Sequence, residues 1–378
     1  MNFKHTSKRK SFEKIVKNII KSFNPSADMK EELLGKFYFD KLATSGLIGH
    51  CLSSEVGGND GDIADAAIIT EQLSKYSLSL ATIYLVNSIF SGYLISIGAN
   101  VDMRKRLLTK LVKGESKFAF ALTEPEAGSD ARNISTLATP VCNGYQLSGT
   151  KHYITGANIA DYIIVVALKF SEENDRDVAI FVVPRATKGL KITVQPKKSS
   201  NVFASCKLEL DDVFVEKKNV IGDYHSKNEG WGLLKTTGAL ERLLVAVSCY
   251  GSAQTIYERT LSFAKNRVQF GKAISEFQVI QHRLVEMATK VQSMRWMALQ
   301  PAFQFSKCEI PIQQISMAKI YCSESLVEIA QSALKIYGGR ACFEEEILSE
   351  LYNESVIGLF AGGTNEIQKN IIAKTIGI

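Results

Sequence analysis

Residues 120–131 read Phe-Ala-Leu-Thr-Glu-Pro-Glu-Ala-Gly-Ser-Asp-Ala, and residues 151–158 read Lys-His-Tyr-Ile-Thr-Gly-Ala-Asn. Proline fixes one backbone angle of a turn and glycine tolerates left-handed conformations, so Pro125 and Gly128 predict a tight turn in the first stretch. Both stretches lie just inside the part of the chain where helical patterns give way to β-rich runs.

Hydrophobic periodicity divides the 378 residues into three parts. Up to about residue 117, apolar residues recur at three- and four-residue intervals, as in amphipathic helices. Residues 118–228 contain β-rich runs separated by Gly, Pro, Asn and Asp, and long helical patterns return from residue 229 onward. The helical patterns cover 31–47, 62–76, 103–112, 231–265, 276–306 and 312–337, and the β-rich runs cover 162–168, 178–183, 190–194 and 206–210.

This order predicts an α+β multidomain fold. It consists of an N-terminal α-helical domain (1–117), a middle β-barrel or sandwich domain (118–228) and a C-terminal α-helical domain, a four-helix bundle (229–378). Helical and β-rich patterns do not alternate, which argues against a doubly wound sheet. The sequence contains no G-x-G-x-x-G, which removes the usual signature of a dinucleotide-binding Rossmann domain.

Composition restricts the function classes. Hydrophobic residues make up 46% and charged residues 22% of the 41.7 kDa chain, as in an ordinary soluble protein. The net charge of +6 favours anionic ligands or simply solvates the surface. Basic residues do not cluster with aromatic ones, so nucleic-acid binding is not expected. The histidines and cysteines lack metal-ligand spacing, and the dispersed cysteines indicate reduced thiols and a cytoplasmic location.

Two apolar segments have features of targeting or membrane elements. Residues 3–23 place lysines around regularly spaced apolar residues, and we expect the first helix of the fold here, because transit peptides favour Arg and Ser. Residues 76–101 carry no charge and are long enough to span a membrane. This segment also contains Asn87, several serines and two glycines, so we expect a buried helix and no membrane span.

The stretches at 120–131 and 151–158 resemble the flavin-contacting loops of the acyl-CoA dehydrogenase family. The resemblance extends in the same order over nearly the whole chain. It implies FAD as the cofactor, the three-domain fold of that family and the oxidation of an acyl thioester. In the family, helices such as the uncharged segment wall the acyl tunnel.

The resemblance implies that residues 120–129 pass beside the flavin ring. Hydride transfer to the ring leaves negative charge on it, which hydrogen-bond donors stabilise. Tyr153 stands where the family usually has Trp, and this leaves the identity of the electron acceptor open. The ring-contacting residues are then Phe120, Leu122, Thr123, Ser129, Tyr153 and Thr155, with Ser129 also toward the substrate.

Three further segments resemble the parts of the family that bind the rest of FAD. Arg267 matches an arginine that neutralises the pyrophosphate across a dimer interface, and a guanidinium offers a diphosphate planar, paired donors. Lys335 departs from the glutamine that is usual there. The residues implied are Arg267, Phe270, Gln278, Lys335, Gly338, Gly339, Thr364 and Glu366. Sites shared across subunits imply a homodimer or homotetramer.

The resemblance also locates the catalytic base. In many relatives a glutamate precedes the glycine of the C-terminal loop, but Gly362 stands there in this chain. The isovaleryl- and long-chain-type branches place their base where Glu241 stands and carry a small residue in the C-terminal loop. We therefore expect Glu241 to be the base, with burial raising its pKa enough to remove an α-proton. Arg242 and Gly363 match positions near the phosphopantetheine and the thioester.

The implied reaction is FAD-dependent α,β-dehydrogenation of an acyl-CoA, with electrons passed to an acceptor such as electron-transfer flavoprotein. Two alternatives stay open. Gly238-Ala239 is smaller than the residues that many CoA-using relatives carry before the base, which leaves room for an acyl or aminoacyl group on a carrier protein. The other alternative is a catalytically inert flavoprotein subunit of a complex.

Overall fold

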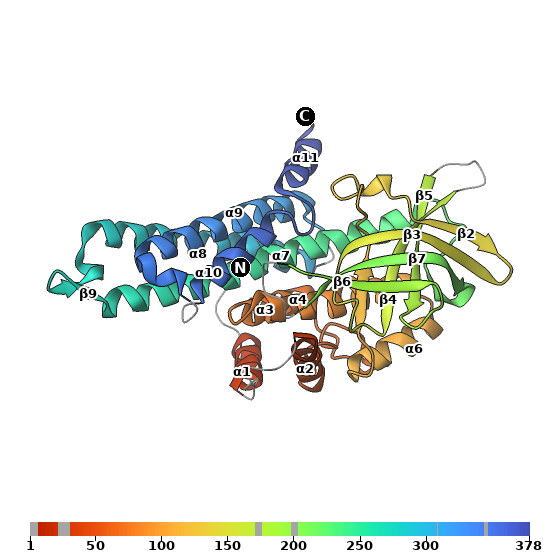
Figure 1. Cartoon of the computed structure of the whole chain (residues 1–378), viewed down its shortest axis with the longest axis horizontal. Coiled ribbons are helices and arrows are strands. Elements are labelled where there is room, and N and C mark those ends of the chain that lie inside the picture. Colours follow the sequence, from red (N-terminus) through yellow and green to blue (C-terminus); the bar gives the residue numbers. More distant parts are fainter. Residues whose placement is uncertain (1–6, 22–30, 171–175, 198–202, 308, 344–346) are drawn as a thin grey trace. The chain divides into compact units, whose positions relative to one another are not determined.

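The computed structural model describes residues 7–21, 31–170, 176–197, 203–307, 309–343 and 347–378 (Figure 1). The chain forms two compact units. Unit 1 comprises Met1–Val16, Ile63–Ala81 and Arg242–Ile378, and unit 2 comprises Lys17–Asp62 and Thr82–Glu241. Each unit combines segments that are distant in the sequence, and helix α7 (Glu229–Asn266) contributes to both.

The N-terminal part is helical, as its apolar spacing predicts. Helix α1 covers the central part of the predicted 3–23 segment, whose two ends lie outside the described residues. The side chain of Asn100 accepts a hydrogen bond from Met103 N at 2.9 Å and caps α6. The helices are α1 (Ser7–Lys21), α2 (Glu31–Thr44), α3 (Ile63–Ser74), α4 (Leu78–Tyr84), α5 (Leu94–Gly98) and α6 (Val101–Val112).

The uncharged segment forms a continuous helical stretch of α4, the π-helix η2 (Leu85–Tyr93) and α5. By length and composition Leu78–Gly98 is able to cross a membrane, but 72% of its most apolar window is buried, as in a core helix. Within unit 2, the Asn87 amide donates to Ile83 O at 3.0 Å and accepts from Phe118 N at 2.8 Å. This buried side chain therefore joins the π-helix to the first strand.

Unit 2 contains an eight-stranded sheet (Figure 1), in the order β6-β7-β3-β2-β4-β5-β8, with β1 paired in parallel to β4. Its core is built from inward-facing apolar side chains such as Leu147, Phe181 and Leu208. The strands are β1 (Phe118–Ala121), β2 (Leu137–Val141), β3 (Gly144–Thr155), β4 (Tyr162–Phe170), β5 (Arg176–Pro184), β6 (Leu190–Gln195), β7 (Ser205–Glu216) and β8 (Val220–Ile221).

Strand β7 is longer than the β-rich run at 206–210 predicts. That run stops at Asp211 and Asp212, which look like turn residues. In the structure Asp212 adopts a left-handed φ of 49°, the pairing with β3 shifts register, and Val213 then pairs with Leu147. The two aspartates therefore mark a bulge inside the strand and not its end.

The C-terminal helices of unit 1 follow the predicted periodicity. α8 (Gln278–Phe305) and α9 (Ile312–Tyr337) lie side by side (Figure 1), and α10 (Leu348–Ser355) and α11 (Asn365–Ile376) pack against α9. α9 begins and ends where its pattern predicts. The hairpin of β9 (Val268–Gln269) and β10 (Lys272–Ala273) precedes α8. The short 3-10 helices are η1 (Ser54–Val56), η3 (Ala131–Asn133), η4 (Lys217–Asn219), η5 (Ile274–Glu276), η6 (Gly338–Cys342) and η7 (Val356–Leu359).

Candidate active site

The strand and loop expected beside the flavin ring lie in unit 2. After β1 the chain turns tightly, because Glu124 N donates to Ala127 O at 3.1 Å and Ala127 N donates to Glu124 O at 3.2 Å. The turn includes Pro125, as the sequence predicts, whereas Gly128 follows directly after the turn. The candidate side chains differ in exposure: Phe120, Leu122 and Thr123 are half-buried, and Ser129 is exposed.

The second candidate stretch forms the end of β3. The pairing of β3 with β7 shifts between Lys151 and Ile154, and Tyr153 there adopts a φ of 60°. A residue other than glycine in this region is uncommon and is often found at functional sites. The irregularity leaves the Tyr153 side chain 66% exposed, whereas Thr155 is half-buried.

The two stretches are held together by hydrogen bonds. His152 N donates to Thr123 O at 2.9 Å, and Lys151 Nζ donates to Leu122 O at 2.9 Å. Lys151 Nζ also lies 2.7 Å from a carboxylate oxygen of Glu124. The first strand–loop segment and the end of β3 therefore form one local assembly within unit 2.

Neither Lys151 nor Glu124 was assigned a role from the sequence, yet both side chains are buried, with exposed fractions of 0% and 3%. A signal was available in β3, because side chains of a strand alternate between two faces. Tyr145, Leu147 and Lys151 occupy alternate positions and are all buried. An inward-facing lysine in such a strand requires an acceptor, and Glu124 is the acidic partner.

The expected base, Glu241, lies on α7 and is the last residue of unit 2. It is half-buried and follows the buried residues Ala239 and Leu240. A partly shielded carboxylate on a long helix is compatible with a general base. Gly362 belongs to unit 1, so the idea that Gly362 makes room for Glu241 stays a prediction.

The candidate residues around the hairpin lie in unit 1. Gln269 pairs with Lys272, and the two residues between them, Phe270 and Gly271, have φ values of 52° and 81°. Two consecutive left-handed residues are typical of a type I′ hairpin turn. This turn leaves the Phe270 ring 94% exposed, and Arg267 and Gln278 are also exposed.

The end of α9 packs against the end of α7. The rings of Phe263 and Tyr337 stack with centroids 3.9 Å apart, and Tyr337 lies between Lys335 and Gly338. This contact brings the Lys335–Gly339 segment to the part of α7 that leads to Arg267. Lys335, Gly338 and Gly339 are exposed, and a Cβ at either glycine would meet nothing within 4 Å.

The C-terminal loop is held onto α9 and α11. The Gln368 amide donates to the carbonyl oxygens of Gly362 and Gly363, each at 3.2 Å. Both glycines adopt left-handed φ values, 68° and 89°, which favour glycine. The side chain of Thr364 caps α11 by accepting from Ile367 N at 3.3 Å, and Glu366 is exposed beside Lys369.

The residues present fit the chemistry of FAD within each unit. In unit 2 the partly exposed aromatic residues Phe120 and Tyr153 suit the faces of a flavin ring. In unit 1 the exposed cations Arg267 and Lys335 suit a diphosphate. The open space at Gly338 and Gly339 allows close approach of a ligand to the backbone.

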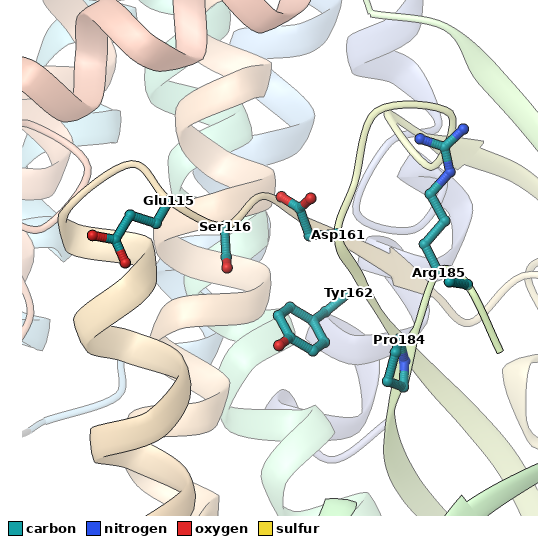
Figure 2. Close-up of a pocket in the computed structure, with 7 residues that line it drawn as sticks. Glu115, Ser116, Asp161, Tyr162, Pro184 and Arg185 are labelled. Carbon is teal, nitrogen blue, oxygen red and sulfur yellow. The ribbon is translucent and has the colours of Figure 1, made fainter.

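Unit 2 also has a pocket of about 500 Å³ (Figure 2). Its seven lining residues include none of the candidate site residues. The Asp161 carboxylate accepts from Lys117 N at 2.7 Å, so it stabilises the chain just before β1. The pocket is therefore distinct from the candidate flavin and substrate residues. The lining residues are Glu115, Ser116, Asp161, Tyr162, Pro184, Arg185 and Ala186.

Comparison with known protein families gives a clear assignment. The acyl-CoA dehydrogenase N-terminal, middle and C-terminal domain models match residues 4–115, 119–213 and 228–377. The chain belongs to the acyl-CoA dehydrogenase family. Membership confirms the predicted family and its architecture of N-terminal helices, a middle β domain and C-terminal helices, and it makes the chain an oxidoreductase of that family.

Individual acyl-CoA dehydrogenase relatives cover almost the whole chain. CarC, a subunit of the caffeyl-CoA reductase–Etf complex of Acetobacterium woodii, is 30% identical over 358 residues, covering 94% of this chain and 92% of that protein. The L-prolyl-(peptidyl-carrier protein) dehydrogenase of Serratia sp. is 28% identical over 93% of this chain and 91% of its own. The FAD complex of PigA matches with a TM-score of 0.92 and 26% identity over 100% of this chain and 99% of that one. The family and this complex support the prediction of FAD.

Proposed function

We propose that this acyl-CoA dehydrogenase family member catalyses FAD-dependent α,β-dehydrogenation of an acyl thioester. The observation that carries the proposal is the half-buried Glu241 on α7, in a family member whose C-terminal loop has Gly362 in place of the usual glutamate. Without Glu241 this chain would lack a carboxylate at either position where the family keeps its base.

In this proposal FAD, when bound, would supply the acceptor for the hydride of the β-carbon, and residues of the chain supply the other functions. The Glu241 carboxylate removes the α-proton, and partial burial and an apolar acyl chain make it a stronger base. The Gly363 N–H donates to the thioester oxygen and so acidifies the α-carbon. Arg242 binds the phosphopantetheine end, and Ser129 contacts both flavin and substrate.

The FAD contacts in this proposal form two sets, and the set around Arg267 acts across a subunit interface, as the family resemblance implies. Residues of unit 2 contact the ring, and the aromatic side chains of Phe120 and Tyr153 cover its faces. Residues of unit 1 bind the rest of the dinucleotide, with Arg267 and Lys335 neutralising phosphate charge. The other members of these two sets are Leu122, Thr123, Ser129, Thr155, Phe270, Gln278, Gly338, Gly339, Thr364 and Glu366.

A second copy of the chain and a soluble electron acceptor complete the proposal, with a cytoplasmic location. Phe270 is 94% exposed, and Val268, Val279 and Val285 nearby in the sequence are also exposed, which supports burial against a second subunit. A homodimer or homotetramer is expected. The relationship to a subunit of a reductase–Etf complex supports an electron-transfer flavoprotein as the redox partner, and we propose that it accepts the electrons here.

The carrier of the acyl group has two candidates. A CoA thioester is the substrate type for which the family is named, but a relative named as a peptidyl-carrier-protein dehydrogenase supports a tethered acyl or aminoacyl group as the second candidate. The small Gly238-Ala239 pair before Glu241 favours this second candidate. The remaining alternative is an inert flavoprotein subunit.

The test is an anaerobic titration of the purified flavoprotein with a panel of acyl-CoAs while the visible flavin absorbance is recorded. We expect the wild type to bleach with at least one acyl-CoA and Glu241→Gln to keep FAD but lose the bleaching, because an amide cannot take the α-proton. The matched control is Glu258→Gln, an exposed position on the same helix.

The other outcomes separate the alternatives. Bleaching of Glu241→Gln at the wild-type rate would contradict the assignment of the base. A fully flavinylated wild type that bleaches only with acyl-carrier-protein substrates would select the carrier-protein candidate. A wild type that bleaches with neither class would support the inert subunit.

A further inference from the structure

Lys151 is a fully buried lysine in the strand β3 of unit 2, and its ammonium binds two groups of the flavin-side loop. Nζ lies 2.7 Å from Glu124 Oε1 and donates to the backbone carbonyl of Leu122 at 2.9 Å. Leu122 and Glu124 stand on either side of Thr123. The Lys151 side chain therefore contacts the loop at two points, a backbone oxygen and a carboxylate.

The Glu124 carboxylate also binds a third segment of the chain, at Ser135 and Thr136. Oε2 accepts from Ser135 N at 2.6 Å and from Ser135 Oγ at 2.8 Å, and Oε1 accepts from Thr136 N at 2.9 Å. Burial alone would raise the pKa of Glu124, but the Lys151 ammonium and these hydrogen bonds lower it to about 2. Burial lowers the pKa of Lys151 to about 8 against the opposing effect of Glu124, so both groups are charged at neutral pH.

The hydrogen bond to Leu122 O fixes the orientation of the next peptide group. In a planar trans peptide the C=O and N–H point in opposite directions. Because Leu122 O points to Lys151, the N–H of Thr123 in the same peptide group points away from it. Thr123 O is held from the same strand by His152 N at 2.9 Å. The backbone N–H of Thr123 is thus directed away from the Lys151 ammonium.

A buried ion pair is a weak choice for stability alone, because apolar residues of similar volume often stabilise a core at least as well. Here the ion pair is attached to a loop that is expected to run along the flavin ring. Pre-oriented donors are what a ring that gains negative charge requires.

We propose that Lys151, through Leu122 O and Glu124, is a positioning residue that pre-orients the 120–129 loop and its Thr123 N–H for FAD. The proposal deepens the proposed function and rests on its assignment of this loop to the flavin ring. It concerns cofactor binding only, so its outcome is independent of whether Glu241 is the base.

The test compares Lys151→Met with wild type in three measurements. The first is the Kd of the apoprotein for FAD, measured by quenching of flavin fluorescence. The second is amide hydrogen exchange of residues 120–129 in the apoprotein, and the third is the visible spectrum of bound FAD. Loss of a charge-assisted hydrogen bond should weaken FAD binding by roughly ten- to a hundredfold. We also expect faster exchange confined to 120–129 and its contacts and a shifted flavin band, and Lys151→Arg should restore part of the affinity.

The matched control is Lys191→Met, which removes another lysine–glutamate pair of the same sheet, Lys191 with Glu209, at an exposed site. This control should change neither the affinity for FAD nor the amide exchange of residues 120–129. Wild-type FAD affinity and spectrum in a folded Lys151→Met protein would overturn the proposal, and so would faster exchange spread evenly over the whole sheet. If Lys151→Met does not fold, Ser135→Ala removes a single bond to Glu124, and we expect a smaller change in the same direction. Unchanged affinity and exchange in that variant would overturn the proposal equally.

Discussion

A buried lysine holds a site loop in each unit, and the two lysines contact their loops through different kinds of group. Lys151 in β3 of unit 2 donates to the carboxylate of Glu124 and to Leu122 O. Lys319 in α9 of unit 1, also 0% exposed, donates to Leu359 O at 2.9 Å and to Asn365 Oδ1 at 2.7 Å, both of which are uncharged. The first lysine is bound to its loop by an ion pair, and the second binds its loop through neutral oxygens.

The difference follows from how each loop meets its scaffold. The 120–129 loop folds back on itself at a tight turn and offers a carboxylate to the strand. The C-terminal loop joins η7 to α11, and the backbone carbonyls of this loop are held by the amide of Gln368. Asn365 extends the contact by donating to Ser323 Oγ at 3.1 Å. In the ion pair, the stabilisation of the loop depends on two charged groups. In the amide network, it depends on several neutral hydrogen bonds.

The largest expected effect comes from Glu124→Gln, which leaves the Lys151 ammonium buried beside an amide. Breaking a buried ion pair by removing one partner destabilises by about 3–5 kcal/mol. Urea unfolding of the holoprotein at pH 7 measures this loss. The double variant Lys151→Met/Glu124→Gln should recover part of this loss, because no charge is then buried and the amide oxygen at position 124 can still accept from the backbone N–H of Ser135 or Thr136.

The matched control for that comparison is Glu209→Gln, whose carboxylate pairs with Lys191 and Lys207 at a partly exposed position of the same sheet. Exposed pairs contribute little, so this variant should unfold close to the wild type. If Glu124→Gln is as stable as Glu209→Gln, the buried Lys151–Glu124 ion pair does not contribute the stability assigned to it. The contrast between Lys151 and Lys319 would then be wrong.

A smaller effect is expected from Lys319→Met. The variant removes the donor to Leu359 O, whereas Asn365 Oδ1 keeps the hydroxyl of Ser323 at 3.2 Å. Leaving a part-buried acceptor without its donor costs at most about 1–3 kcal/mol, and the removal of a buried ammonium offsets part of this cost. Amide exchange should quicken in residues 359–365 and stay unchanged in 120–129.

Lys369→Met serves as the control for this variant, since Lys369 is an exposed lysine of α11 that pairs with Glu366. It should leave exchange in 359–365 at the wild-type rate. Equal acceleration of exchange in both site loops after Lys319→Met would indicate that the two loops are stabilised together and would remove the distinction between them.

The long elements of the fold were predictable because their signals are local. α9 was predicted to its ends, since apolar residues recur at helical spacing from Ile312 and Gly338 follows the last turn. β7 was predicted only in its first half. Asp211 and Asp212 resemble turn residues, and nothing in the local sequence indicates that Val213 pairs again with Leu147 across a bulge.

Candidate site residues could be named from the sequence where a contiguous motif carries them, as in 120–129 and 362–368, and their roles stay predictions. The roles of Lys151 and Lys319 were not predicted, because lysine is mostly exposed and its burial depends on partners far away in the sequence. Glu124 is 27 residues from Lys151, and Leu359 is 40 residues from Lys319. Only the folded chain brings these groups within hydrogen-bond distance.

The smallest expected effect is a pH dependence of the stability that the Lys151–Glu124 ion pair contributes. The pKa of Glu124 is about 2 in the folded protein and 4.5 in the ordinary carboxyl, so the pair contributes its full stability above about pH 4.5 and loses it progressively as the pH falls toward about 2. The difference in unfolding free energy between wild type and Glu124→Gln should therefore narrow by about 1 kcal/mol between pH 4.5 and 3.5, since one proton shifts stability by about 1.4 kcal/mol per pH unit. Urea unfolding of both proteins at these two pH values measures the change. A difference that stays constant or widens in this range would mean that Glu124 is not held as a carboxylate by Lys151, and the contrast with the neutral acceptors of Lys319 would lose its basis.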